Sequence, residues 1–194
     1  MGYCHRISKH EAGLYCEHLL RLDAGSRYAR FSGTVSDTAI KNYVDRIDWV
    51  CSEVIAFVID REVRGAAELR YSRCERRSGV ELAFSVEQAF QNNGTGSLLL
   101  NKSLMLLHYR DIPFAKLACN TANRRMVKLT RQYGAVVSAD GSDLTLVIAV
   151  PHRSVYITTL TGDGRSWPDE NCDIRRTGCF NNQPHKQVPA PVHQ

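Results

Sequence analysis

Apolar residues recur at helical spacing in two stretches near the start of the chain. Four leucines form an apolar stripe in residues 10–22, and residues 37–50 repeat the spacing behind Ser36, which is a favourable N-cap. Both stretches therefore predict helices. A short strand is predicted over residues 3–7, and the polar residues 23–33 predict a break between the two helices.

Three stretches in the middle of the chain have the spacing of β-strands. Residues 53–60 are a run of apolar, β-prone side chains, and residues 63–72 follow after a short charged connection that suits a hairpin. Residues 80–86 alternate, with Leu82 and two further apolar side chains on one face and Glu81 on the other.

The second half of the chain reads as loop, helix, strand, helix and hairpin. A leucine-rich helix over residues 96–109 precedes a strand at 113–119, a helix at 121–135 and a final hairpin that ends at residue 150. A helix between two strands normally makes a right-handed crossover between parallel neighbours. The strands at 80–86 and 113–119 should therefore run parallel, and the fold class is mixed α/β.

The composition changes at Pro151. Residues 151–194 contain five of the six prolines in the chain and show no periodicity. We therefore predict one folded domain over residues 1–160 and a poorly ordered tail over residues 161–194.

The bulk composition argues against several classes of protein. The net charge of +5 is mildly basic, but dense Lys/Arg clusters are missing, so we expect no nucleic-acid partner. No apolar run approaches the roughly eighteen residues that cross a membrane, and the N-terminus does not read as a signal peptide. Seven irregularly spaced cysteines without a CxxC pair are typical of reduced thiols in the cytoplasm. The spacing of Cys172 and Cys179 matches no common zinc motif, so we expect no metal.

One short segment predicts either a tight turn or a binding site. In FQNNGTGSLLL, residues 90–100, two glycines separated by one residue stand at the start of the leucine-rich helix. The first turn of a helix has unpaired N–H groups and a partial positive charge, and glycine lets a ligand approach the backbone. These features suit a phosphate or pyrophosphate. The dinucleotide-binding and P-loop fingerprints both fail here on spacing.

A third pattern does match this segment. Gln91-x-x-Gly94-x-Gly96, which follows a strand and opens a helix, resembles motif A of the GNAT superfamily of acyl-CoA N-acyltransferases. The order of elements over residues 3–150 and the spacing within the helix that follows Asn123 are also similar to that family. The resemblance implies a GNAT-type, mostly antiparallel sheet whose central parallel strands separate around the cofactor.

The resemblance also implies where acetyl-CoA would bind. Its pyrophosphate would lie on the N–H groups of the loop, and its pantetheine arm would pair with the strand backbone near Phe84 and Val86. Asn123 matches an asparagine that contacts the cofactor, although capping the helix explains it equally well from the residues alone. The cofactor-binding residues implied in this way are Phe84, Val86, Gln91, Asn92, Asn93, Gly94, Thr95, Gly96 and Asn123.

Direct transfer of an acyl group from a thioester to an amine needs a base, because an ammonium cannot attack. Glu81 is the candidate base, since its position resembles that of the catalytic glutamate in bacterial protein-lysine acetyltransferases. The alternative is a glutamate that only faces solvent, and Glu68 on the neighbouring strand is the second candidate base. Many GNAT enzymes carry a tyrosine acid where this chain has Thr130, and Tyr133 has the phase of the apolar stripe. We therefore expect no tyrosine acid at this position.

The resemblance thus implies an acetyl-CoA-dependent N-acetyltransferase. We expect it to be a cytoplasmic monomer or homodimer without a membrane partner. The acceptor amine is left open between a protein lysine and a small molecule. The alternative is a non-catalytic acyl-CoA-binding sensor on the same fold. In GNAT relatives a stretch similar to residues 26–31 lies near the acceptor side of the cleft; the other explanation for these residues is a solvated loop.

Overall fold

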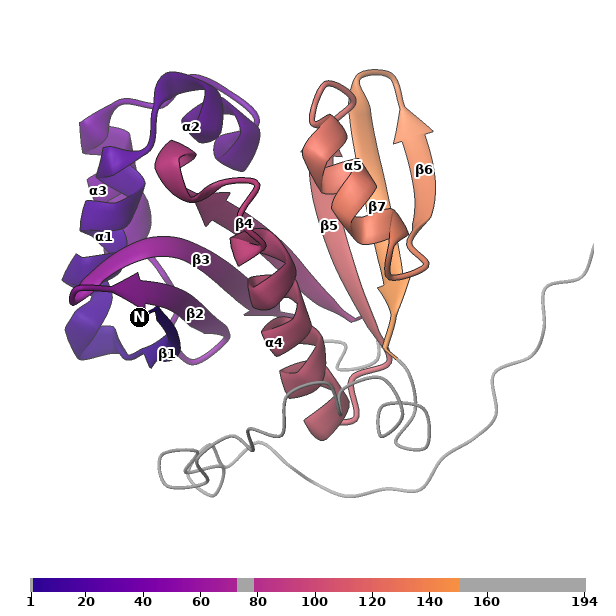
Figure 1. Cartoon of the computed structure of the whole chain (residues 1–194), viewed down its shortest axis with the longest axis horizontal. Coiled ribbons are helices and arrows are strands. Elements are labelled where there is room, and N and C mark those ends of the chain that lie inside the picture. The colour runs from indigo at the N-terminus through magenta and orange to yellow at the C-terminus, as the bar shows by residue number, and fades with distance from the viewer. Residues whose placement is uncertain (1, 73–78, 151–194) are drawn as a thin grey trace, which may run out of the picture. The chain divides into compact units, whose positions relative to one another are not determined.

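The computed structural model describes residues 2–72 and 79–150, and the predicted tail, residues 161–194, lies outside them. The strands of the described sheet are β1 (Tyr3–Ile7), β2 (Ser52–Ile59), β3 (Glu62–Tyr71), β4 (Val80–Val86), β5 (Phe114–Asn120), β6 (Val136–Asp140) and β7 (Asp143–Ala149). The helices are α1 (Ala12–Arg21), α2 (Ala24–Phe31), α3 (Asp37–Asp45), α4 (Thr95–Tyr109) and α5 (Arg124–Arg131), with 3₁₀ turns η1 (Lys9–Glu11) and η2 (Gln88–Phe90). The strands lie side by side in the order β1-β2-β3-β4-β5-β7-β6 (Figure 1), which confirms the predicted mixed α/β class.

Strands β4 and β5 run parallel, as predicted, but they are paired only at their first residues. The register joins Val80 to Ala115 and Glu81 to Lys116. By contrast, β4 pairs with β3 along its whole length, and β5 does the same with β7, both antiparallel. Strands β4 and β5 therefore diverge toward their carboxyl ends, as Figure 1 shows.

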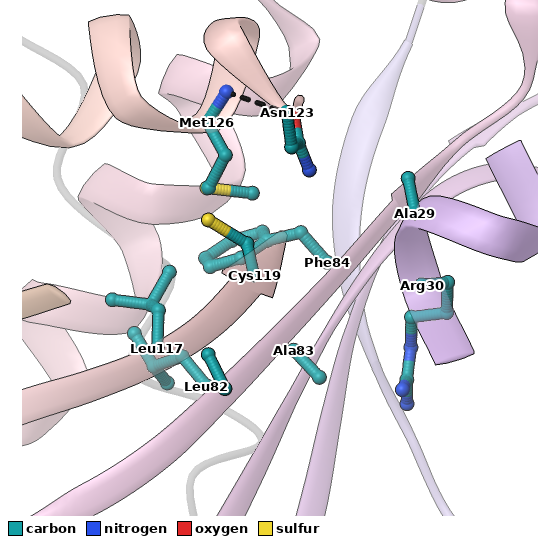
Figure 2. A pocket seen from close by; sticks show the side chains of 10 residues that line it. Ala29, Arg30, Leu82, Ala83, Phe84, Leu117, Cys119, Asn123 and Met126 are labelled. Carbon is teal, nitrogen blue, oxygen red and sulfur yellow. Dashed lines mark hydrogen bonds between the residues drawn. The ribbon is translucent and has the colours of Figure 1, made fainter. Parts of the chain in front are cut away.

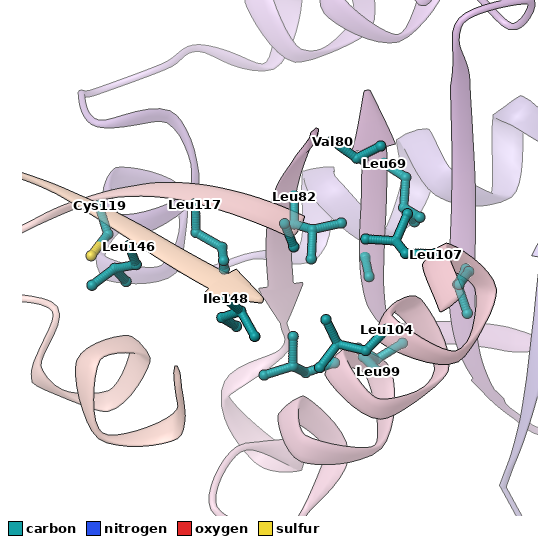
Figure 3. Close-up of a cluster of buried hydrophobic side chains, with 14 of the residues drawn as sticks. Leu69, Val80, Leu82, Leu99, Leu104, Leu107, Leu117, Cys119, Leu146 and Ile148 are labelled. Carbon is teal, nitrogen blue, oxygen red and sulfur yellow. The ribbon is translucent and has the colours of Figure 1, made fainter. Parts of the chain in front are cut away.

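Helix α4 lies on one face of the sheet and forms a hydrophobic core with it. Its leucines, among them Leu99, Leu104 and Leu107, are almost completely buried and pack with Leu82 and Ile148 of the sheet (Figure 3). Burying a leucine side chain contributes about 1.5–3 kcal/mol. This core therefore holds the start of α4, and with it the glycine loop, against the central strands.

Helices α1 and α3 cover the other face of the sheet over β1, β2 and β3. Tyr15 and Leu19 of α1 pack there with Ile40 and Val44 of α3 and with apolar side chains such as Val54. Among the described residues, this second core ends at β3 and does not continue onto β4. The same face of β4 is therefore free to carry polar and small side chains.

The structure contradicts the predicted break at residues 23–33, because helix α2 forms there. Asp23 caps the helix by accepting a hydrogen bond from the Ser26 backbone N–H at 3.0 Å. The side chain that α2 buries is Arg30, which is only 4% exposed, and not an apolar residue. A short helix with a buried arginine shows no apolar stripe, which is why the pattern missed it.

Three of the predicted helices are longer than the observed ones, whereas the helix predicted over residues 96–109 agrees with α4 to within one residue. The helix predicted over residues 37–50 ends at Asp45, and α5 is shorter than predicted at both ends. In α1 the buried stripe includes Tyr15 and His18, whereas Leu14 is exposed. None of the described helices has both the length and the apolar character needed to cross a bilayer.

Candidate active site

A cavity of about 50 Å³ lies where β4 and β5 separate. Its lining residues are Leu82, Ala83 and Phe84 of β4, Leu117, Ala118 and Cys119 of β5, Ala29 and Arg30 of α2, and Asn123 and Met126 at the start of α5. Asn123 and Met126 lie on one side of the cavity, and Ala29 and Arg30 lie on the other (Figure 2). The cavity therefore occupies the break in the parallel pair.

The glycine loop follows β4 and leads directly into α4. Gly94 is the N-cap of α4 and has a φ of 81°, a left-handed conformation that favours glycine. No described side chain caps this end of the helix, and its first turn has no acidic residue. The N–H groups of the first turn are therefore left for a ligand or water. Asn92, Asn93 and Gly94 are exposed, whereas Thr95 is buried.

Gly65 of β3 lets the strand approach the start of α4. A Cβ atom at this position would lie 3.1 Å from Thr95 Cγ2 and 3.3 Å from Leu99 Cδ1. Both distances are tight, so a larger side chain would push the helix away from the sheet. Glycine at residue 65 therefore helps to fix the position of the loop.

Gln91 ties the loop to three neighbouring elements. Its Nε2 donates hydrogen bonds to the Val86 carbonyl at 2.9 Å and to Ser26 Oγ of α2 at 3.0 Å. Its Oε1 accepts a hydrogen bond from Arg125 of α5. The predicted cofactor residues Gln91 and Val86 thus contact each other, at the point where β4 ends.

Glu87 anchors the segment that leads from β4 into the loop. His18 Nδ1 lies 3.2 Å from Glu87 Oε1, Arg21 Nε donates to the same oxygen at 2.9 Å, and Arg64 donates to the other oxygen at 3.0 Å. Burial opposes the ionised form, but these hydrogen bonds outweigh it and lower the pKa of Glu87 to about 2.

His18 also links α1 to Ser85 of β4, because its Nε2 lies 2.9 Å from Ser85 Oγ. The row Ser85–His18–Glu87 has the connectivity of a nucleophile and its base. However, Ser85 is only 6% exposed and does not line the cavity, and burial lowers the pKa of His18. The row therefore acts as a cross-link between helix and strand.

Glu81, the candidate base, lies on the open face of the sheet just before the cavity. Its side chain is 51% exposed and forms an ion pair with Arg70 of β3 at 2.9 Å. It shares a strand face with Ala83, which lines the cavity. Two residues of strand place Glu81 about 7 Å from Ala83, so Glu81 lies at the rim of the cavity and not inside it.

Glu68, the second candidate base, lies in a closed polar network. It is 1% exposed, and its Oε2 accepts hydrogen bonds from Tyr15 at 2.9 Å, from Tyr43 at 2.6 Å and from Arg30 at 2.7 Å. A buried carboxylate needs such partners, because an unpaired one is strongly unfavourable. The network makes Glu68 the group that holds Arg30 in place.

Asn123 has the capping role and also lines the cavity. Its Oδ1 accepts a hydrogen bond from the Met126 backbone N–H at 3.1 Å, which makes it the N-cap of α5. The cap uses the side-chain oxygen, so the side-chain nitrogen is left to face a ligand (Figure 2). The two explanations for Asn123 are therefore compatible.

Neither the hydroxyl of Thr130 near the end of α5 nor that of Tyr133 just after it is placed as an acid in the cavity. Thr130 is fully buried, and its Oγ1 donates to the Met126 carbonyl at 2.9 Å. Tyr133 packs at the edge of the core, its hydroxyl lies 3.5 Å from the Ser97 carbonyl, and burial raises its pKa. Neither residue lines the cavity.

The described residues contain no group of three or more His, Cys, Asp or Glu side chains that could hold a metal ion. Cys119 is 4% exposed, and burial raises the pKa of its thiol. The pair Cys172 and Cys179 lies outside the described residues. Cys119 therefore has the properties of a cavity wall and not of an activated nucleophile.

The sequence pattern missed two parts of this site. Arg30 was grouped with a polar break, and its burial depends on Glu68, which is 38 residues away. His18 and Glu87 are separated by 69 residues. The spacing Asp23-x-x-Ser26 is a capping signal that points to α2, but no local signal pairs its arginine with a distant glutamate.

Comparisons with known proteins give the fold. Neither a protein-family model nor a curated protein matches the sequence. The chain is similar in structure to the GNAT domain of PAT from S. lividans, at 19% identity and a TM-score of 0.65, over 76% of this chain and 90% of that one. It is also similar to the PaiA N-acetyltransferase from Thermoplasma acidophilum in complex with coenzyme A, at 15% identity, a TM-score of 0.59 and 77% and 99% coverage. A third similar structure is spermidine N-acetyltransferase from Vibrio cholerae in complex with CoA and spermine, at 15% identity, a TM-score of 0.60 and 77% and 95% coverage. With its separated parallel strands and its glycine loop, the chain therefore has the GNAT acetyltransferase fold.

Proposed function

We propose that the chain is an N-acetyltransferase that transfers an acetyl group from acetyl-CoA to an amine. The observation that carries the proposal is the cavity between β4 and β5, next to an α4 N-terminus without a side-chain cap, in a chain with the GNAT fold. Solved structures with this fold include complexes with coenzyme A, one of which also contains spermine.

The chain offers a different feature to each part of the co-substrate. The first-turn N–H groups of α4, from Gly94 to Gly96, suit the pyrophosphate, because they are uncapped and lie at the positive end of the helix. The backbone of β4 near Phe84 and Val86 has no partner strand on the β5 side and suits the amide groups of the pantetheine arm. Asn123 lines the opposite side of the cavity, where its side-chain nitrogen suits a contact with acetyl-CoA.

Glu81 is the proposed base for the acceptor amine. Its carboxylate reaches solvent at the rim of the cavity and is held by Arg70. It takes the amine proton directly or through one water, after which the amine nitrogen attacks the thioester carbon. Glu68 is less suited to this role, because three hydrogen-bond donors already surround its Oε2.

The test is the release of thiol from acetyl-CoA by the full chain with a panel of lysine peptides, polyamines and small amines. The variant Glu81→Gln should lower kcat by about 100-fold or more and leave acetyl-CoA affinity unchanged. Glu17→Gln, an exposed glutamate on α1, is the matched control and should behave like the wild type. A kcat that Glu81→Gln leaves unchanged would contradict the assigned role.

A second candidate function is a non-catalytic acyl-CoA sensor on the same fold. It is favoured by the positions of Thr130 and Tyr133, whose hydroxyl groups do not reach the cavity. The same assay separates the two functions. A sensor would bind acetyl-CoA but release no thiol with any acceptor, and Glu81→Gln would then change nothing.

A further inference from the structure

Arg30 is the only charged residue among those that line the cavity. It lies on the α2 side, next to Ala83 of β4 (Figure 2). Its side chain is 4% exposed, so water screens its charge weakly. The cavity therefore has in its wall a buried guanidinium that is paired with the buried carboxylate of Glu68.

The surroundings of Arg30 hold it rigidly. One of its terminal nitrogens donates to Glu68 Oε2 at 2.7 Å and to the Tyr43 hydroxyl at 2.8 Å. Its guanidinium lies over the rings of Phe31 and Tyr43, at 4.9 Å and 5.4 Å from their centres. Tyr15 completes the network from α1. Four elements therefore fix the position of one guanidinium.

One N–H donor of this guanidinium makes no hydrogen bond to the described residues. The Arg30 Nε atom is buried and has no hydrogen-bond partner among the described residues. A buried N–H without a partner is unfavourable, and arginine has donors only, so the missing partner must be an acceptor atom. An amine nitrogen that attacks a carbonyl cannot fill this role, because its lone pair is in use.

We propose that Arg30 Nε donates a hydrogen bond to the sulfur of coenzyme A and stabilises the thiolate that leaves during acyl transfer. This inference rests on the proposed function. When the amine nitrogen bonds to the carbonyl carbon, the C–S bond breaks and its electron pair goes to sulfur. Arginine keeps its proton, so the thiolate is held as an anion and takes a proton later from solvent.

Hydrogen-bond donors other than Arg30 are available to the oxygen of the thioester carbonyl. Arg30 is therefore available to the sulfur. Beyond Glu81 the β5-facing side of β4 has no partner strand, so its backbone N–H groups are available to the carbonyl oxygen. On the α5 side the hydroxyl groups of Thr130 and Tyr133 do not line the cavity. The fixed cation of Arg30 therefore takes the place of an acid.

Several titratable groups surround Arg30. Its neighbours are Glu68 of β3, Tyr15 of α1 and Tyr43 of α3, and Cys119 of β5 lines the same cavity. Burial raises the pKa of both tyrosines and of the cysteine. The other charged groups on this face, Arg70, Glu81 and Lys116, lie outside the lining of the cavity. An alkyl thiol titrates from about pH 8.5 upward.

The test compares coenzyme A with desulfo-coenzyme A, which lacks the thiol, by isothermal titration of the full chain from pH 7 to 10. Binding of the thiolate to a fixed cation should raise the ratio of the two affinities by about tenfold across this range. The desulfo compound corrects for titration of the protein itself. In Arg30→Met/Glu68→Gln, which removes the buried ion pair as a unit, the ratio should stay flat.

Two further variants keep the test decisive. Arg30→Lys retains a charge for Glu68 but has no Nε donor, so the rise should be largely lost. Arg6→Met removes an exposed arginine of β1 that does not line the cavity, and the rise should remain. A flat ratio in the intact protein, or a full rise in both Arg30 variants, overturns the inference while leaving coenzyme A binding intact. Failure of both compounds to bind would instead overturn the proposed function as well.

Discussion

At the scale of single residues, the charges that the fold buries are paired and support the site. The Glu68 carboxylate accepts hydrogen bonds from Arg30 and from two tyrosine hydroxyls. The Glu87 carboxylate accepts hydrogen bonds from Arg21 and Arg64 and lies within hydrogen-bonding distance of His18. Removing one partner of such a pair leaves an uncompensated charge, which is costly. The buried charges therefore make the geometry of the cavity wall and of the loop sensitive to single substitutions.

Glu87 should make the fold sensitive to acid. Its pKa is about 2 in the folded chain against an ordinary value of 4.5, so the stabilisation it contributes is present above pH 4.5 and is lost as the pH falls through about 2. Glu87→Gln should lower the free energy of unfolding at pH 7 by about 3 kcal/mol, and by much less near pH 2. Denaturant unfolding at both pH values measures this difference. Equal losses at the two pH values would show that Glu87 does not act through its charge.

The sequence predicts the residues of the site that belong to a local pattern, but not those that are placed by contacts between distant parts of the chain. Asn123 and the loop glycines belong to a local pattern, and local patterns are visible in the sequence. Arg30 depends on Glu68 of β3, and the two side chains meet only because α2 packs on the neighbouring strand β4. The position of Gly65 under the start of α4 is another tertiary contact of this kind. No spacing along the chain encodes such contacts.

At the scale of elements, the divergence of β4 and β5 creates the site. The two strands share two residue pairs at their amino ends, and β4 then continues with β3 alone. The parallel pair followed from the helix between the strands, but the place where the strands separate is set by their packing. Helix α2, which forms part of the cavity wall, was hidden because the side chain it buries is a charged one.

The divergence predicts a change in amide hydrogen exchange when acetyl-CoA binds. If the pantetheine arm pairs with β4, peptides that cover residues 82–86 should exchange more slowly with acetyl-CoA than without it. Peptides from β2 are the internal control, since that strand is already paired on both sides. Exchange in residues 82–86 that is unchanged at saturating acetyl-CoA would contradict the proposed position of the arm.

At the scale of the whole molecule, two hydrophobic cores on opposite faces of the sheet explain why the site lies where it does. Strand β2 alternates between them, with Val54 in one core and Ile55 in the other, which is why residues 54–59 are continuously apolar. The core under α1 and α3 ends at β3. On the same face β4 carries Glu81 and β5 carries Lys116, and both are exposed. The polar site therefore begins where the second core stops.

The proposed function depends most directly on one contact, in which the uncapped N-terminus of α4 holds the pyrophosphate of acetyl-CoA. Gly96 is the best position to test it, because a Cβ there meets only Leu129 Cδ2, at an ordinary 3.5 Å. An aspartate in the first turn stabilises a helix, so a loss of binding would not reflect a loss of folding. Asparagine has the same size without the charge and is the matched control.

The measurement is isothermal titration of the full chain with acetyl-CoA, for the wild type, Gly96→Asn and Gly96→Asp. We expect Gly96→Asp to bind acetyl-CoA at least about tenfold more weakly than Gly96→Asn, because its carboxylate repels the phosphates. Equal affinities of the two variants would contradict it, and the glycine loop would then be no more than a turn.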